Sequence, residues 1–162
     1  MMKRILILCA VLCAFFSAFA LSGCGDEDSA PAVVAVVSGT EIGIDIDITE
    51  AVYVTSVNEV YNNFKNYLGK TIRIEGMTTT EDFSADGGGV YRYVYRTGPG
   101  CCGTDGAMCG FEYTADSYPL DGEWIEVIGK LTSYDEDGVT YLSLDSVAVT
   151  VKQERGAEVV SQ

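Results

Sequence analysis

Three cysteines within nine residues are the side chains of this sequence best suited to chemistry. Cys101, Cys102 and Cys109 lie in the glycine-rich run from Gly98 to Gly110. Thiolates bind Zn²⁺ or Cu⁺ and carry redox chemistry, and thiols of exported proteins form disulfides. Glycine also lets a backbone approach an ion or ligand closely. This segment is therefore the first candidate for a site.

Four interpretations of the cysteine segment stay open. One is a disulfide between Cys109 and one of the adjacent pair. The pair itself does not suit a disulfide, because its Cα atoms are about 3.8 Å apart and disulfides need about 4.4–6.8 Å. Another is a Zn or Cu site completed by Asp105 or Glu112, although the adjacent pair departs from the usual C-x₂₋₄-C spacing. The others are a redox centre, which lacks a C-x-x-C motif, and unpaired buried thiols.

The composition argues against most enzymes. The chain has 162 residues and no histidine, which excludes Ser/His/Asp triads, Cys/His dyads and imidazole-dependent zinc sites. No phosphate-binding P-loop or dinucleotide-binding glycine motif occurs. The 10 basic and 24 acidic residues give a net charge of −14. Such a chain repels nucleic acids and attracts cations and basic partners, so we expect no nucleic-acid partner and no enzymatic activity.

Three tyrosines are candidates for a ligand-binding face. Tyr91, Tyr93 and Tyr95 alternate along the segment 90–96, whose aromatic and β-branched content predicts a strand. They would therefore share one face of a sheet. Cross-strand packing is the competing interpretation of the same stripe.

The N-terminus predicts an export signal and a lipid anchor. Met1–Arg4 is basic, Ile5–Ala20 is apolar, and Leu21–Cys24 resembles the lipobox of bacterial lipoproteins. This resemblance implies a signal peptide over residues 1–23 and a diacylglyceryl group on Cys24. It places the protein on the extracytoplasmic face of the cell membrane or outer membrane. The polar, turn-rich start of residues 24–41 predicts a lipidated tether. Within it, the apolar run 32–37 favours a loosely placed strand, and a segment that packs near the membrane is the alternative.

The remaining pattern predicts a mainly β domain over residues 42–151. Apolar spacing after the capping box Ser56–Glu59 predicts one amphipathic helix at 57–68. About five strands, separated by turn sequences, follow the helix. A small five-stranded OB-like barrel fits them because closure of the barrel removes the edges of the sheet. A small sandwich is the alternative, and residues 152–162 are expected to form a frayed tail. The expected strands are Lys70–Thr78, Val90–Arg96, Phe111–Thr114, Glu123–Tyr134 and Val139–Val151, with a bulge at Gly129 and a turn at Asp135–Gly138.

The order of several motifs resembles a group of uncharacterised bacterial lipoproteins and secreted proteins. These motifs are Tyr67–Gly76, Cys101-Cys102, Gly110–Tyr113 and Trp124–Gly129. The Cys101-Cys102 pair ahead of the Trp124–Gly129 strand is also distantly similar to the C-terminal domain of a permease-subunit family. The resemblance spans about residues 44–150. The resemblance implies an OB-like domain with the cysteine pair as its hallmark.

We therefore expect a lipid-anchored, extracytoplasmic binding or accessory module. Its partners would be the membrane, through the lipid on Cys24, and a membrane protein such as a permease. A Zn or Cu lipoprotein that uses Cys101, Cys102 and Cys109, and a structural envelope protein, are the alternatives.

Overall fold

The computed structural model describes residues 33–99 and 106–161. The chain divides into two units, residues 1–31 and 32–162, and all the described residues belong to the second. The predicted signal peptide, Cys24, Cys101 and Cys102 lie outside the described residues. Within the described ranges, no helix is long and apolar enough to cross a membrane.

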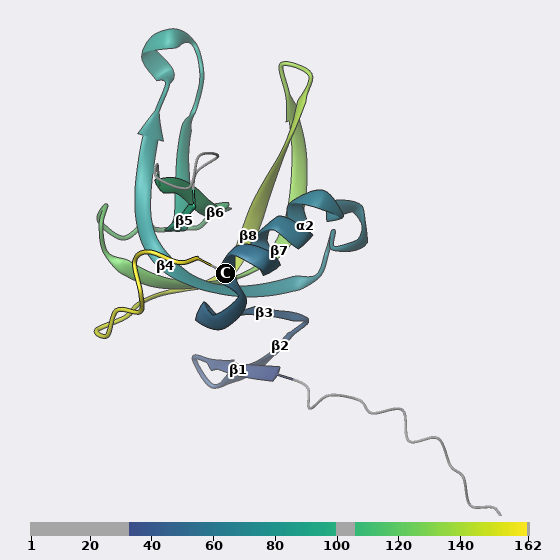
Figure 1. Ribbon diagram of the computed structural model, residues 1–162, viewed down its shortest axis with the longest axis vertical. Coiled ribbons are helices and arrows are strands. Elements are labelled where there is room, and N and C mark those ends of the chain that lie inside the picture. Colours follow the sequence, from purple (N-terminus) through teal and green to yellow (C-terminus); the bar gives the residue numbers. More distant parts are fainter. Residues whose placement is uncertain (1–32, 100–105, 162) are drawn as a thin grey trace, which may run out of the picture. The chain divides into compact units, whose positions relative to one another are not determined.

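Five long strands form a closed barrel (Figure 1). Their order is β4-β5-β6-β8-β7, and β7 returns to pair with β4. All pairs are antiparallel except β6 with β8. This confirms the prediction of a mainly β, five-stranded OB-like barrel. The strands are β4 (Thr71–Asp82), β5 (Val90–Pro99), β6 (Gly106–Thr114), β7 (Trp124–Glu136) and β8 (Val139–Val151).

Glycines allow the strands to bend and approach closely enough to close the barrel. The first part of β4 pairs with β7 and the second part pairs with β5. A Cβ atom at Gly76 would collide with the backbone of Tyr95, and one at Gly110 would collide with the backbone of Val94. The register of β7 with β8 shifts between Ile128 and Gly129, which confirms the predicted bulge.

Side chains that alternate along the strands fill the barrel. Ile72, Ile74, Val94, Phe111 and Leu144 are fully buried in one core cluster. Each such side chain contributes about 1.5–3 kcal/mol relative to exposure. The helix α2 (Tyr53–Asn62) packs into the same cluster through its own buried side chains, Tyr53, Val57 and Val60.

The helix begins and ends earlier than the sequence predicts. Short 3₁₀ turns, η1 (Glu50–Val52) and η2 (Phe64–Asn66), flank α2. The predicted capping box is wrong, because Ser56 lies inside the helix and the Glu59 carboxylate accepts hydrogen bonds from Asn63 and Tyr67 instead. No side chain caps the N-terminus at Val52. Burial of Tyr53 in the core, rather than a cap, sets the start of the helix.

Most of the predicted tether forms a hairpin. Strands β1 (Val33–Val37) and β2 (Thr40–Ile44) are antiparallel, and β3 (Ile46–Ile48) runs parallel to β4. The Ser38–Gly39 turn has positive φ at both residues, which suits a two-residue hairpin. The tether prediction is therefore wrong for residues 33–41, whereas the strand expected over residues 32–37 is present as β1, which pairs with β2.

The predicted frayed tail is also wrong for residues 152–161. The N–H of Thr97 donates to the Glu158 carbonyl at 2.8 Å, and the N–H of Val160 donates to the Thr97 carbonyl at 2.9 Å. Val160 is 6% exposed and belongs to the core cluster. Backbone pairing with β5 and one buried valine hold this segment on the barrel.

Candidate functional site

Two hairpins project from the same side of the barrel (Figure 1). The far ends of β4 and β5 form one, with pairing that reaches Asp82 and Val90. The ends of β7 and β8 form the other, closed by the predicted turn at Asp137–Gly138 with positive φ at both residues. A cleft of about 380 Å³ lies between them, which we name the hairpin cleft. It is lined by Glu81, Phe83, Gly88, Tyr91, Tyr93, Tyr134, Glu136, Asp137 and Tyr141.

Aromatic rings from both hairpins line this cleft. Tyr134 and Tyr141 stack with their centroids 5.5 Å apart and their planes at 20°. Phe83 and Tyr91 lie 6.1 Å apart in a tilted arrangement. Tyr141 is 41% exposed and Phe83 is 44% exposed, so a ligand can reach their rings.

Hydrogen bonds from tyrosine to glutamate brace the cleft. The Tyr91 hydroxyl, on β5, donates to the Glu136 carboxylate, on β7, at 2.6 and 2.8 Å, which links the two hairpins. The Tyr134 hydroxyl donates to the buried Glu112 carboxylate at 2.6 Å. Burial raises the pKa of Glu112, and burial with nearby acids raises the pKa of Tyr93 to about 12. The pKa values of Tyr91 and Tyr134 are raised as well, so these three tyrosines stay protonated near neutral pH.

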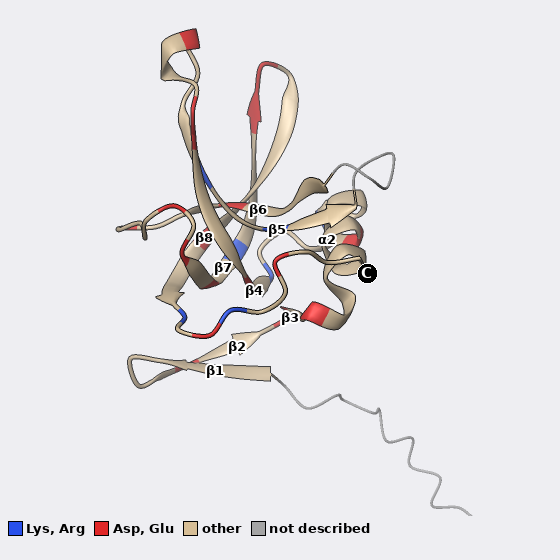
Figure 2. Ribbon diagram, turned by 60° about the vertical axis from the view of Figure 1, so that its left-hand side comes forward, with Lys and Arg blue, Asp and Glu red and all other residues tan. Residues whose placement is uncertain are grey.

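The cleft has an uncompensated negative charge. Glu81, Glu136 and Asp137 line it, and none of its nine described lining residues is Lys or Arg. Arg92 lies between two cleft tyrosines in sequence, but its guanidinium stacks on the Tyr118 ring, 4.2 Å from the centroid. Acidic residues also mark the ends of both hairpins in Figure 2. The cleft thus combines the faces of aromatic rings with carboxylates that have no basic partner among the described lining residues.

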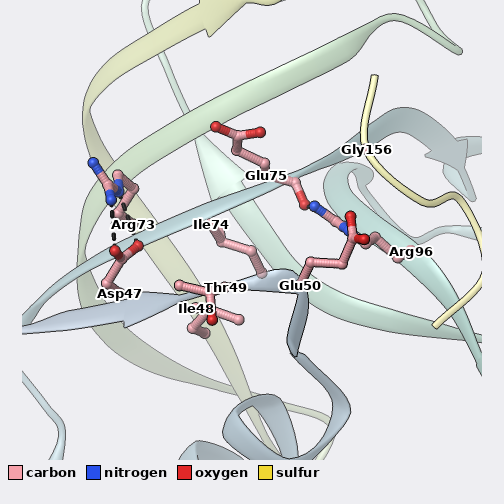
Figure 3. Close-up of a pocket in the computed structure, with 9 residues that line it drawn as sticks. All are labelled: Asp47, Ile48, Thr49, Glu50, Arg73, Ile74, Glu75, Arg96 and Gly156. Atoms are coloured by element: carbon pink, nitrogen blue, oxygen red, sulfur yellow. Dashed lines mark hydrogen bonds and ion pairs between the residues drawn. The ribbon is translucent and has the colours of Figure 1, made fainter. Parts of the chain in front are cut away.

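A second cavity, of about 240 Å³, lies beside β3 and has its charges paired (Figure 3). Arg73 forms an ion pair with Asp47, with a 2.9 Å bond from Nε. Arg96 donates to the Glu50 carboxylate at 2.9 Å and to the Glu75 carbonyl at 2.9 Å. Because these groups satisfy one another, this cavity is better explained as part of the fold than as a ligand site.

The structure divides the predicted tyrosine stripe. Tyr91 and Tyr93 line the hairpin cleft, whereas Tyr95 pairs with Met77 and Gly110 in the barrel wall and is not among the lining residues. Sequence reasoning missed Tyr134 and Tyr141. Their positions beside the predicted Asp135–Gly138 turn signalled a hairpin, but only the barrel topology shows that this hairpin faces β5.

Of the predicted cysteine site, the described residues contain Cys109 alone. It lies on β6, half-buried against the core, and burial raises the pKa of its thiol. Cys101 and Cys102 fall in the undescribed segment 100–105. Among the described positions, no group of three or more Cys, Asp or Glu side chains is placed to hold a metal ion.

Comparison with known proteins places the chain by sequence family. Neither a curated protein nor a solved structure matches it. A family model does match, over residues 32–156, which include the whole barrel and both projecting hairpins. The chain therefore belongs to the DUF1980 C-terminal domain family.

Proposed function

We propose that this protein is a non-enzymatic binding module that a lipid on Cys24 holds at the extracytoplasmic face of a bacterial membrane. The observation that carries the proposal is the hairpin cleft. In OB-like barrels, ligands bind to the face of the second and third strands, between the loops that follow the first and fourth strands. Here those elements are β5, β6 and the two projecting hairpins, and residues of β5 and of both hairpins line the cleft.

The chemistry of the cleft favours binding over catalysis. A general base near neutral pH needs a free group whose pKa is close to that pH. The Tyr93 phenol has a pKa of about 12, and the carboxylates of Glu112 and Glu136 already accept tyrosine protons in hydrogen bonds. These groups are suited to holding a ligand in place.

We further propose that the module serves a membrane protein such as a permease. This proposal rests on the similarity to the permease-subunit domain and on the predicted lipid, which would keep the barrel within reach of a transporter. Binding of Zn or Cu by Cys101, Cys102 and Cys109 is a second proposal. It is tested by adding Zn²⁺ to the reduced full chain and measuring the number of metal ions bound per chain.

Tyrosine NMR tests the cleft proposal directly. The full chain, labelled with ¹³C at its tyrosine rings and held in detergent micelles, would be titrated with neutral oligosaccharides, small organic cations and Zn²⁺. We expect at least one class to cause saturable shifts at Tyr91, Tyr93, Tyr134 and Tyr141, while Tyr118, outside the cleft, stays unmoved.

A matched pair of variants controls the assignment. Tyr93→Leu removes a cleft ring, and Tyr95→Leu removes its neighbour on the same strand, outside the lining. The first change should weaken binding at least tenfold and the second should not. If no class moves the four cleft resonances, the cleft is not a binding site and the proposal is wrong.

A further inference from the structure

We infer that the hairpin cleft recognises a compact organic cation, an ammonium or alkylated ammonium group. This inference rests on the proposed function and specifies the chemistry of its ligand. Two sources could supply such a group, a free amine or a lysine side chain of a partner protein.

The rings provide the first contact that a cation needs. Ammonium groups are attracted to the faces of aromatic rings within about 6 Å of the centroid, by about 0.5–2 kcal/mol for each ring. Both hairpins contribute rings to this cleft, four tyrosines and Phe83. A group that enters between the hairpins therefore meets aromatic side chains on both sides. The volume of about 380 Å³ falls within the range of small-molecule sites.

The tyrosine hydrogen bonds strengthen that attraction. Tyr91 and Tyr134 donate their hydroxyl protons to carboxylates. Donation to an anion polarises the phenol and shifts electron density into the ring, because hydrogen bonds in a network polarise one another. The two rings are thus more attractive to a cation than unbonded phenols would be. The same bonds fix the rings before the ligand arrives, which reduces the entropy cost of binding.

The unpaired carboxylates provide the charge complement. Each of the five ion pairs among the described residues lies outside the cleft lining. Glu81 and Glu136, both half-buried, and the exposed Asp137 have no basic partner there. An anionic ligand would be repelled by this set. A neutral ligand would use the rings but not the charge of these carboxylates, whereas a cation uses both.

Matched probes separate the charge of the ligand from its shape. Choline and its neutral isostere 3,3-dimethyl-1-butanol have the same shape, but the charged quaternary nitrogen of choline is a neutral quaternary carbon in the alcohol. A blocked Ala-Lys-Ala peptide represents the partner-protein source. Each would be titrated into the full ¹³C-tyrosine-labelled chain in micelles, with the cleft resonances as the readout. We expect choline or the peptide to bind at least tenfold more tightly than the isostere, and the tighter of the two identifies the source.

Charge-removing variants test where the cation binds. Asp137→Asn is suited to this because asparagine tolerates the positive φ of 50° at this turn and Asp137 makes none of the hydrogen bonds that brace the cleft. Together with Glu81→Gln it should weaken cation binding about tenfold. Glu41→Gln removes one charge from an exposed position on β2 and should leave binding unchanged.

The outcomes distinguish this inference from the proposed function. If the isostere or a neutral oligosaccharide binds in the cleft as tightly as the cations, the cation inference is wrong and the binding function stands. Equal binding of choline by the wild type and the Asp137→Asn, Glu81→Gln chain also overturns the inference. If no probe of any class moves the cleft resonances, both proposals fail.

Discussion

Arg96 is a charged side chain in a position where a barrel usually holds an apolar one. It is 3% exposed and lies 4.8 Å from the ring centroids of both Tyr53 and Trp124. Its guanidinium donates to the Glu75 and Ala157 carbonyls and to the Glu50 carboxylate. One side chain therefore joins β4, β5, the start of the helix and the C-terminal segment. The planar fork of arginine makes this possible, since its donors point in several fixed directions.

Replacement of Arg96 by methionine should lower the free energy of unfolding by about 2–4 kcal/mol. The change removes the part-buried hydrogen bonds from Arg96 to the Glu75 and Ala157 carbonyls, each worth about 1–2 kcal/mol, while Glu50 stays solvated because its side chain is 55% exposed. Urea unfolding measures the effect. Arg96→Lys keeps the positive charge but lacks the planar guanidinium, so it should retain only part of the stability that Arg96→Met loses. Equal stability of Arg96→Met and the wild type would show that this network does not hold the fold together.

Glu112 should make the stability of the protein depend on pH. Burial raises its pKa above the ordinary value of 4.5. Between 4.5 and the raised value, the folded chain keeps a proton that the unfolded chain has lost. The free energy of unfolding therefore falls as pH rises through this window, and the loss is complete above the folded pKa.

The variant Glu112→Gln cannot ionise and should lack this contribution, while its amide oxygen can still accept the Tyr134 hydrogen bond. Urea unfolding of both chains at pH 4 and pH 8 should show the wild type losing stability relative to the variant at the higher pH. The exposed Glu41→Gln chain serves as the control. A relative gain for the wild type on going to pH 8 would contradict the prediction.

At the scale of elements, the C-terminal segment acts as part of the barrel. Val160→Ala should destabilise the protein by about 1–2 kcal/mol, because it removes two buried methyl groups from the core. The neighbouring Val159→Ala is the matched control. Val159 is 70% exposed, so its loss should change stability by less than about 0.5 kcal/mol. Thermal or urea unfolding checks both, and equal effects would mean that this segment is not docked in solution.

The sequence predicted those elements whose signals are local. Strand β8 occupies the predicted residues 139–151, and the Asp137–Gly138 turn lies where the sequence places it, because alternation and turn chemistry act over a few residues. The predicted start of the helix was wrong because a long-range contact, the burial of Tyr53, outweighed the local capping box. The prediction of a frayed C-terminal segment was wrong because the partner of this segment, Thr97, is about 60 residues earlier in the chain.

The candidate site could be predicted only in half for the same reason. Tyr91 and Tyr93 form a visible stripe on one strand. Tyr134, Tyr141 and Glu136 come from another hairpin, and their meeting with β5 depends on the closure of the barrel. A local pattern can show that a strand has an aromatic face. It does not show which distant hairpin lies opposite.

At the scale of the whole molecule, the negative charge bears on how the chain can be held at a membrane. The net charge of −14 gives a field that concentrates cations and is repelled by anionic lipid headgroups. A single acyl chain binds a membrane only marginally, and many lipidated proteins add a polybasic patch as the second signal. With 24 acidic and 10 basic residues, this chain is poorly suited to such a patch. Stable attachment by lipid alone would therefore require at least two acyl chains, as a diacylglyceryl group on Cys24 would provide.

Replacement of Cys24 by serine should abolish membrane attachment. In a bacterial host, the wild-type chain should fractionate with membranes, lack residues 1–23 and carry the added mass of its acyl chains. The Cys24→Ser chain should carry no lipid, and Cys13→Ser, within the predicted signal peptide, should behave as the wild type. Membrane fractionation with intact-mass measurement checks all three chains. A soluble wild-type chain of unmodified mass that retains residues 1–23 would overturn the lipid anchor, while the hairpin cleft and its cation test would stand unaffected.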